Sequence, residues 1–267
     1  MSATNKTRAV PMLVWQLLLG AVLVAAWEAG TSARLLDKFF FSRPSDIANR
    51  VWQLFSNGSV WSHLGTTLLE AALSFAIGVA AGVVFGFLLA RNDFLAALLD
   101  PYLRVANALP RVVLAPVFLL WFGLGIWSKV ALGVTVVFFI VFFNTFQGVR
   151  EVDPVIINNA RMLGASERQL VRHVLIPSAL SWIFSSLHIS IGFAIIAVVV
   201  GEYLGAARGV GYMIAQAEGV FDTTGVFAGM AILAGVVLCV GAMVGRLERY
   251  LLRWKAHNTG SKSGEVS

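Results

Sequence analysis

The stretch LGTTLLEAALSFAIGVAAGVVFGFLLA, which runs from Leu64 to Ala90, contains one charged side chain, Glu70. An α-helix needs about 20 consecutive apolar residues to cross the hydrocarbon core of a bilayer. This stretch exceeds that length, so it predicts a membrane-spanning helix. Several similar stretches follow, and together they predict an all-α membrane protein, because helices satisfy their own backbone hydrogen bonds in lipid.

The composition shows that most of the surface faces something other than water. The hydrophobic fraction is 58%, the charged fraction is 13% and the mean hydropathy is +0.80. Soluble domains carry about 25% charged residues. The net charge is +6, but no basic stripe with interleaved aromatic residues is present, which argues against nucleic-acid binding. The basic residues lie mainly beside the apolar stretches and at the chain ends, where they meet anionic lipid.

Residues that could carry chemistry are scarce. Cys239 is the single cysteine, which excludes an intrachain disulfide and an iron–sulfur cluster held by this chain alone. The four histidines show no metal-ligand spacing. The chain has no Walker A sequence and nothing that resembles a nucleophile with its base. We therefore expect neither an enzyme nor a cofactor in this chain.

Hydropathy predicts six spans within a transmembrane domain of residues 12–255. The first could be a signal peptide, since Lys6 and Arg8 precede it, but it is longer than a usual signal sequence and lacks a convincing cleavage site. We interpret it as a retained helix. The expected spans are Met12–Ala29, Leu64–Ala90, Ala106–Leu124, Trp127–Phe146, Ser181–Leu204 and Val226–Leu247.

The distribution of Lys and Arg predicts the orientation. Basic residues are concentrated in the segments before the first span, between the second and third, between the fourth and fifth, and after the sixth. The positive-inside rule places these segments in the cytoplasm. We expect both termini there, as an N-terminal tail of residues 1–11 and a flexible tail of residues 256–267, with segments 34–63 and 206–225 outside.

Three glycines on the second span predict a packing surface. Gly78, Gly82 and Gly86 recur every four residues and therefore share one helix face. Small residues at this spacing let another helix approach closely in lipid. The alternative is the ordinary abundance of glycine in membrane helices.

Three prolines, Pro101, Pro110 and Pro116, occur along the third span. Proline removes a backbone donor and kinks a helix, which lipid tolerates only where neighbours or water satisfy the freed carbonyl groups. A helix broken beside a cavity and simple bending are both compatible with this pattern.

The connection of residues 151–179 carries the most specific local signals. Asp153 followed by Pro154 is typical of a helix start, and Gly164 is typical of the position after a helix end. Ser166 and Gln169 form a predicted capping box that opens a second helix, which we expect Pro177 to end. A linker between spans needs only a few residues, so this ordered segment suggests a docking surface for a soluble partner.

The same segment resembles a known motif. The sequence NNARMLGASERQLVRHVLIP, residues 158–177, is similar to the EAA loop of ABC importer permeases through Ala160, Gly164 and Pro177. That motif has Glu-Ala-Ala, a glycine four residues later, and then Ile-x-Leu-Pro. Asn158 and Asn159 stand here in place of Glu-Ala. The spacing is intact, and Arg161 lies within the motif.

Three further stretches resemble the sulfonate/taurine/nitrate branch of these permeases. They are LPRVVLAPVFLLWFGLG at Leu109–Gly125, FNTFQGVREVDP at Phe143–Pro154 and GEYLGAARGVGYMI at Gly201–Ile214. The resemblance covers roughly residues 60–255. It implies a type I ABC importer permease fold in a bacterial cytoplasmic membrane, with residues 154–163 as the coupling helix.

The resemblance also implies partners and a class of substrate. Two permease subunits would pair, preferably as a homodimer, with a homologous permease as the alternative second subunit. They would bind two copies of an ABC ATP-binding subunit, which would hold ATP and magnesium, and an extracytoplasmic solute-binding protein would deliver the solute. The solute would be a small anion such as an alkanesulfonate, taurine or nitrate. Related permeases serve thiamine-precursor, pyrimidine or riboflavin systems, and an ion-coupled secondary transporter is a further alternative.

Polar residues inside the spans are candidates for function because they are costly in lipid. His188 lies near the middle of the fifth span, where it could face the pathway or bond to another helix. Glu202, near the outer end of that span, suggests a structural or gating role. Asn144 could donate a hydrogen bond between helices. Glu70 could be a boundary residue, and Arg111 could attract an anion or reach the membrane interface.

Overall fold

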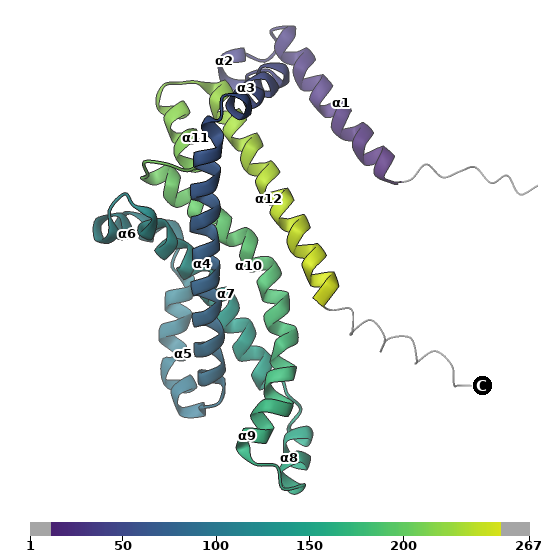
Figure 1. Ribbon diagram of the computed structural model, residues 1–267, viewed down its shortest axis with the longest axis vertical. Coiled ribbons are helices and arrows are strands. Elements are labelled where there is room, and N and C mark those ends of the chain that lie inside the picture. The colour runs from purple at the N-terminus through teal and green to yellow at the C-terminus, as the bar shows by residue number, and fades with distance from the viewer. Residues whose placement is uncertain (1–11, 252–267) are drawn as a thin grey trace, which may run out of the picture.

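The computed structural model describes residues 12–251, and this part of the chain is helical with no strand (Figure 1). The expected tails, 1–11 and 256–267, lie outside the described residues. The helices are α1 (Met12–Ser32), α2 (Lys38–Phe41), α3 (Pro44–Ser56), α4 (Ser59–Ala90), α5 (Asp93–Ala108), the 3₁₀-helix η1 (Arg111–Leu114), α6 (Ala115–Phe122), α7 (Ile126–Arg150), α8 (Pro154–Met162), α9 (Glu167–Leu170), the π-helix η2 (Val171–Leu175), α10 (Ile176–Leu204), α11 (Val210–Gly219) and α12 (Thr223–Leu251).

The all-α prediction is confirmed, and five of the six predicted spans coincide with single helical segments that could cross a membrane. Within residues 12–251, five helical segments are long and apolar enough to cross a membrane: α1, α4, α7, the α9–α10 segment and α12. A sixth span is formed if α5 and the segment Arg111–Phe122 count as one, although they are bent by 88°.

The predicted third span, Ala106–Leu124, is wrong as a single helix. Instead, one helix begins at Asp93 and ends at Ala108. Leu109 is extended (φ −65°, ψ 130°), as the residue before a proline tends to be, so Pro110 ends the helix. Pro101 lies inside α5, and Pro116 occupies the first turn of α6, where its missing donor costs nothing.

The centre of the molecule is a bundle of α4, α7 and α10 (Figure 1). The glycine face of α4 lies against α7. A Cβ atom added at Gly78 would be 2.7 Å from Val137 Cβ, and one at Gly86 would be 2.7 Å from the Phe142 carbonyl oxygen. Gly82 similarly faces the Phe138 carbonyl oxygen, at 2.9 Å. The two backbones therefore approach as closely as small residues allow.

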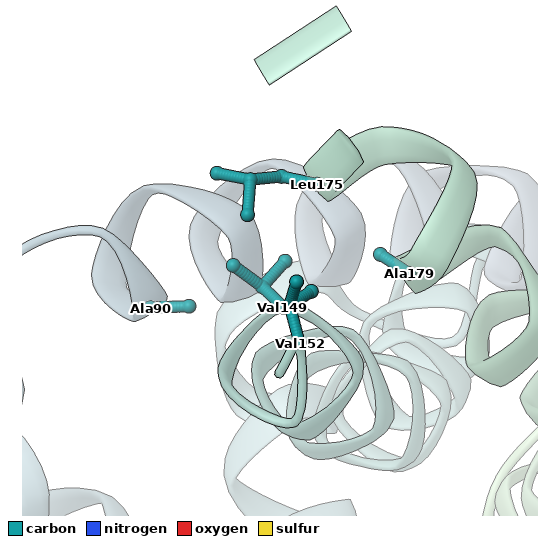
Figure 2. Close-up of a cluster of buried hydrophobic side chains, with 5 residues drawn as sticks. All are labelled: Ala90, Val149, Val152, Leu175 and Ala179. Carbon is teal, nitrogen blue, oxygen red and sulfur yellow. The ribbon is translucent and has the colours of Figure 1, made fainter. Parts of the chain in front are cut away.

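A cluster of buried apolar side chains joins the lower ends of this bundle. Ala90 ends α4, Val149 lies in the last turn of α7 with Val152 just beyond it, Leu175 ends η2, and Ala179 lies in the first turn of α10. Their side chains converge in Figure 2. The segment that carries α8 and α9 thus starts and ends at one packed core.

At the opposite end, α1 diverges from the bundle (Figure 1). Its C-terminal part is attached through Glu28, which accepts hydrogen bonds from the Ser45 backbone N–H (3.0 Å) and hydroxyl (2.9 Å) at the start of α3. Trp27 packs on Phe227 of α12, with ring centroids 5.5 Å apart. An ion pair between Arg50 and Asp222 joins α3 to the loop before α12.

Candidate functional site

Local capping chemistry forms α8. Asp153 Oδ1 accepts the Val155 N–H at 2.8 Å, and Pro154 occupies the first turn. The helix ends at Met162 with Leu163 as its C-cap, and Gly164 follows with φ +82°, a left-handed conformation that glycine adopts without strain. The Ala165 N–H donates to the Ala160 carbonyl at 3.0 Å and closes the turn.

The capping box at the next helix is present. The Ser166 backbone N–H donates to Gln169 Oε1 at 2.8 Å, and the Gln169 N–H donates back to Ser166 Oγ at 3.4 Å. These reciprocal bonds satisfy two of the free donors of the α9 N-terminus. Gly164 and the box together reverse the chain between α8 and α9.

The expectation that Pro177 ends this second helix is wrong. Helical structure runs without a break from Glu167 to Leu204 through α9, η2 and α10. In a regular α-helix, the Pro177 ring would clash with the carbonyl group of His173. The π-helix η2 ends at Leu175, two residues before the proline, and its wider turn contains the carbonyl group with which the ring would otherwise clash. The fifth span is therefore continuous with the segment that follows α8.

Much of the exposed surface of α8 and of its C-cap, Leu163, is apolar. Met162 and Leu163 are 85% and 88% exposed, and Val155 and Ile156 are more than half exposed. Asn158 and Asn159 are also exposed, while Ile157 packs against the core drawn in Figure 2. A hollow of about 300 Å³ lies between α8 and the next helix, lined in part by Ala160, Leu163, Gly164 and His173.

Exposed ion pairs connect α8 to α9, α9 to the end of α4, and α7 to α5. Glu167 Oε1 accepts from Arg161 at 3.1 Å, and its Oε2 lies 3.5 Å from Arg91 at the end of α4. Arg150 of α7 pairs with Asp93 at the start of α5. Such exposed pairs contribute about 0–1 kcal/mol each, so they orient the segment more than they stabilise it.

A polar cavity of about 600 Å³ lies between α5, α7 and α10. Asn144 is part of its lining and donates to the Ile140 carbonyl at 2.8 Å, within α7 and not between helices as expected from the sequence. Asp100 and Arg104 form an ion pair at its edge, at 2.8 Å. The other polar lining residues are Asn107 and Gln147, and Trp182 contributes from α10. A polar face on membrane helices is tolerated where it lines a water-filled space.

Arg111 is engaged by the broken helix. Its guanidinium group donates to the Ala106 carbonyl at 2.7 Å, the Leu109 carbonyl at 2.8 Å and Asn107 Oδ1 at 2.9 Å. It also lies 4.7 Å from the centre of the Phe139 ring. Arg111 thus satisfies the carbonyl groups that the break at Pro110 leaves without helical donors.

His188 and Glu202 lie in different surroundings. The His188 side chain is exposed on α10 and faces α12, where a Cβ atom at Gly245 would be 3.9 Å from its Cε1. Glu202 is fully buried near the end of α10. Its Oε1 accepts from the Thr67 hydroxyl at 2.7 Å, and its Oε2 accepts from the Gly211 N–H at 2.8 Å.

The burial of one lysine was not expected from the sequence. Lys129, at the start of α7, is only 1% exposed, and Glu70 is 2% exposed. The Lys129 ammonium group donates to the Leu124 carbonyl at 2.7 Å and to the Gly125 carbonyl at 3.0 Å. A lysine near the end of a predicted span is usually taken for an interfacial residue, so its position gave no signal. Glu70 is buried within α4 and is not a boundary residue.

The amino-acid sequence matches a known protein family over most of its length. Residues 78–254 match the family described as binding-protein-dependent transport system inner membrane component. The chain belongs to this family. It is therefore an ABC importer permease, a non-enzymatic multi-pass subunit of the inner membrane that works with an ATP-binding subunit and a binding protein.

Individual relatives support the same assignment. This permease is 35% identical to the putative aliphatic sulfonates transport permease protein SsuC of Bacillus subtilis, over 90% of this chain and 87% of the relative. It is 34% identical to the riboflavin transport system permease protein RibX of Chloroflexus aurantiacus, over 88% of each chain.

A solved structure shows the same fold. The permease superposes on a chain in the crystal structure of an amino acid ABC transporter with histidines. The TM-score is 0.61 at 21% identity, and the match covers 75% of this chain and 96% of the other.

Proposed function

We propose that this permease moves a small organic anion of the alkanesulfonate type across the membrane, driven by ATP hydrolysis in a separate subunit that docks on α8. The exposed apolar surface of α8 carries this proposal. Met162, Leu163, Val155 and Ile156 leave a large apolar area uncovered on a segment that is capped at both ends. Such a rigid amphipathic helix suits insertion into a groove on a partner.

The proposed assembly contains two permeases, as a homodimer, and two ATP-binding subunits. ATP and magnesium would bind only to the latter. The Lys and Arg distribution supports cytoplasmic termini, which places α8 on the side where ATP is available. The binding protein would deliver the solute at the other end of the bundle, near α3 and α11.

The polar cavity between α5, α7 and α10 is the proposed passage. Asn107, Asn144 and Gln147 offer amide donors to a sulfonate, and the Asp100–Arg104 pair leaves the lining without a net charge. A weakly polar lining of this kind lets a solute enter without holding it tightly. The substrate assignment rests on the relationship to SsuC, and riboflavin is the alternative that RibX supports.

Co-purification tests the docking proposal. The chain would be expressed with the ATP-binding subunit of its own transport system and purified in mild detergent. We expect Leu163→Asp to lose that subunit, because a buried carboxylate is costly at the centre of an apolar contact. Val220→Asp is the matched control, since Val220 is also apolar and exposed (75%) but lies at the opposite end of the bundle. Equal retention by both variants would contradict docking on α8.

Uptake into proteoliposomes tests the substrate. The wild-type complex with its binding protein should accumulate a radiolabelled alkanesulfonate when ATP is present on the ATPase side. Excess unlabelled alkanesulfonate should abolish this uptake, while riboflavin should not. Competition by riboflavin alone would transfer the assignment to the riboflavin type.

A further inference from the structure

A hollow of about 400 Å³ lies between α8 and the bundle, where α4 and α7 end. Its floor is apolar and includes Ala90, Val149, Val152 and Leu175, which are drawn in Figure 2. Ala90 is the last residue of α4, Val149 lies in the last turn of α7, and both helices are long and apolar enough to cross a membrane. The hollow therefore lies at the level where the hydrocarbon core of a bilayer meets the lipid headgroups.

The rim of this hollow is basic. Arg91 directly follows α4, Arg150 ends α7 and Arg161 belongs to α8. The carboxylates of Asp93 and Glu167 complete the charged lining, so three positive charges face two negative ones. Glu167 is shared by two guanidinium groups, at 3.5 Å from Arg91 and 3.1 Å from Arg161. Because each guanidinium group has five N–H donors, the lining can bind a further anion.

Helix α8 faces the hollow with the side opposite its exposed apolar residues. Pro154, Ile157 and Arg161 line the hollow, and residues spaced by three and four share one face of a helix. Val155 and Met162, which are seven residues apart, lie on the other side and are 59% and 85% exposed. That exposed side is the one proposed to receive the ATP-binding subunit, so the hollow is available to a different molecule.

The position and the chemistry of the hollow together fit an anionic glycerophospholipid. Such a lipid offers a phosphate group to the rim and acyl chains to the apolar floor, whereas a soluble anion would use the rim alone. Arginine binds phosphate through parallel N–H···O bonds, which suits it to this task. Basic pockets between membrane helices on the cytoplasmic side bind lipid headgroups of this kind. The distribution of Lys and Arg along the chain predicts that this end of the bundle is the cytoplasmic one.

We propose that this hollow binds an anionic phospholipid of the cytoplasmic leaflet, with its phosphate held by Arg91, Arg150 and Arg161. The three arginines belong to different elements, so the lipid joins the ends of α4 and α7 to α8. Their exposed pairs with Asp93 and Glu167 are weak, so a phosphate can join them at little cost. Binding of the lipid does not depend on the proposed function. Its consequence does, because a lipid that fixes the position of α8 favours docking of the ATP-binding subunit.

Native mass spectrometry tests this site on the assembled complex of the permease and its ATP-binding subunit. The complex is stripped of lipid in mild detergent and titrated with phosphatidylglycerol, or with phosphatidylcholine of the same acyl chains, whose headgroup has no net charge. We expect phosphatidylglycerol to bind the parent about fivefold more tightly or better. Arg161→Gln should weaken this binding roughly fivefold, the effect of one basic residue at an anionic lipid surface. An excess of inorganic phosphate should not displace the lipid, because it has no acyl chains for the floor.

Two further substitutions separate lipid binding from general effects of charge and of loosening. Arg172→Gln is the matched control, because Arg172 is exposed on η2 at the same end of the bundle but outside the lining, and the affinity should change by less than about twofold. Glu167→Gln breaks two ion pairs but makes the lining more positive. It should tighten binding about twofold or more, whereas a loosened segment would bind more weakly. If Arg161→Gln does not assemble, Arg91→Gln is measured in its place, with the same expected loss.

Several results would overturn the lipid site. Equal affinity of the parent for the two lipids would show that the rim does not select an anion. Equal losses in Arg161→Gln and Arg172→Gln, or weaker binding in Glu167→Gln, would show that the hollow is not where the lipid binds. Displacement by inorganic phosphate would assign the hollow to a soluble anion. The proposed function is tested separately, by ATP-dependent uptake with the parent complex, so its failure would leave these binding results unchanged.

Discussion

Gly86 of α4 lies directly against Phe142 of α7, so that a Cβ atom on the glycine would be 2.7 Å from the Phe142 carbonyl oxygen. This is closer than real Cβ atoms approach a backbone oxygen. The contact recurs one turn earlier on each helix, where Gly82 meets Phe138. The α4–α7 pair is therefore held by backbone proximity, which supports van der Waals packing in lipid where the hydrophobic effect does not act.

A larger side chain on this seam should loosen the bundle. We expect Gly86→Val to lower the free energy of unfolding by about 1–3 kcal/mol, as overpacking usually does, with a lower thermal midpoint in detergent. Gly65→Val is the matched control, because Gly65 lies on the same helix with nothing within 4 Å of its Cβ position. Equal shifts in the two midpoints would show that the seam is not tight.

The N-cap of α8 should affect docking. Asp153→Ala removes the acceptor of the Val155 N–H and should cost α8 about 0.5–2 kcal/mol. The affinity of the isolated ATP-binding subunit should fall by roughly 2- to 30-fold, measured as Kd for the detergent-solubilised chain. Asp153→Asn keeps an acceptor and should bind nearly as well as the parent. A weak Asn variant would indicate a direct role for the charge.

Arg111 should act on stability and not on affinity for the solute. Arg111→Met leaves the Ala106 and Leu109 carbonyls without their donor, which should cost about 1–3 kcal/mol in unfolding free energy. Arg111→Lys should recover part of this stability. A several-fold increase in the KM for uptake, with an unchanged unfolding midpoint, would instead assign Arg111 to the anion.

Single cysteines should report the orientation. In a Cys239→Ser background, Leu163→Cys and Val220→Cys place thiols at two well-exposed sites at opposite ends of the bundle. Impermeant maleimide added to intact cells should label the Val220 position, while the Leu163 position should react only in permeabilised cells. The reverse pattern would invert the proposed topology.

Features that depend on neighbouring residues were predictable from the sequence. The α8 cap at Asp153, the Gly164 turn and the Ser166–Gln169 box each involve residues at most six apart, so their residue types suffice. The glycine spacing likewise defined a face of α4 before its partner was known. The approximate number of spans followed from hydropathy, because lipid imposes a minimum length on every helix that crosses it.

Features that depend on distant contacts were not predictable. The three prolines of the third span have different effects, and only Pro110 ends a helix. The effect of Pro177 depends on the π-helix that precedes it. Lys129 packs against Gly201, which is more than a complete span and a loop away, so nothing near it in the sequence shows that it is buried. Its position at a span end is equally typical of an interfacial lysine.

The coupling of α8 to an ATPase is tested most directly by uptake into proteoliposomes that contain the permease, its ATP-binding subunit and its binding protein. We predict accumulation of an alkanesulfonate that requires ATP on the α8 side and is lost with Leu163→Asp but retained with Val220→Asp. Uptake of the same size without ATP, or by the permease chain alone, would contradict the claim that α8 couples this permease to an ATPase.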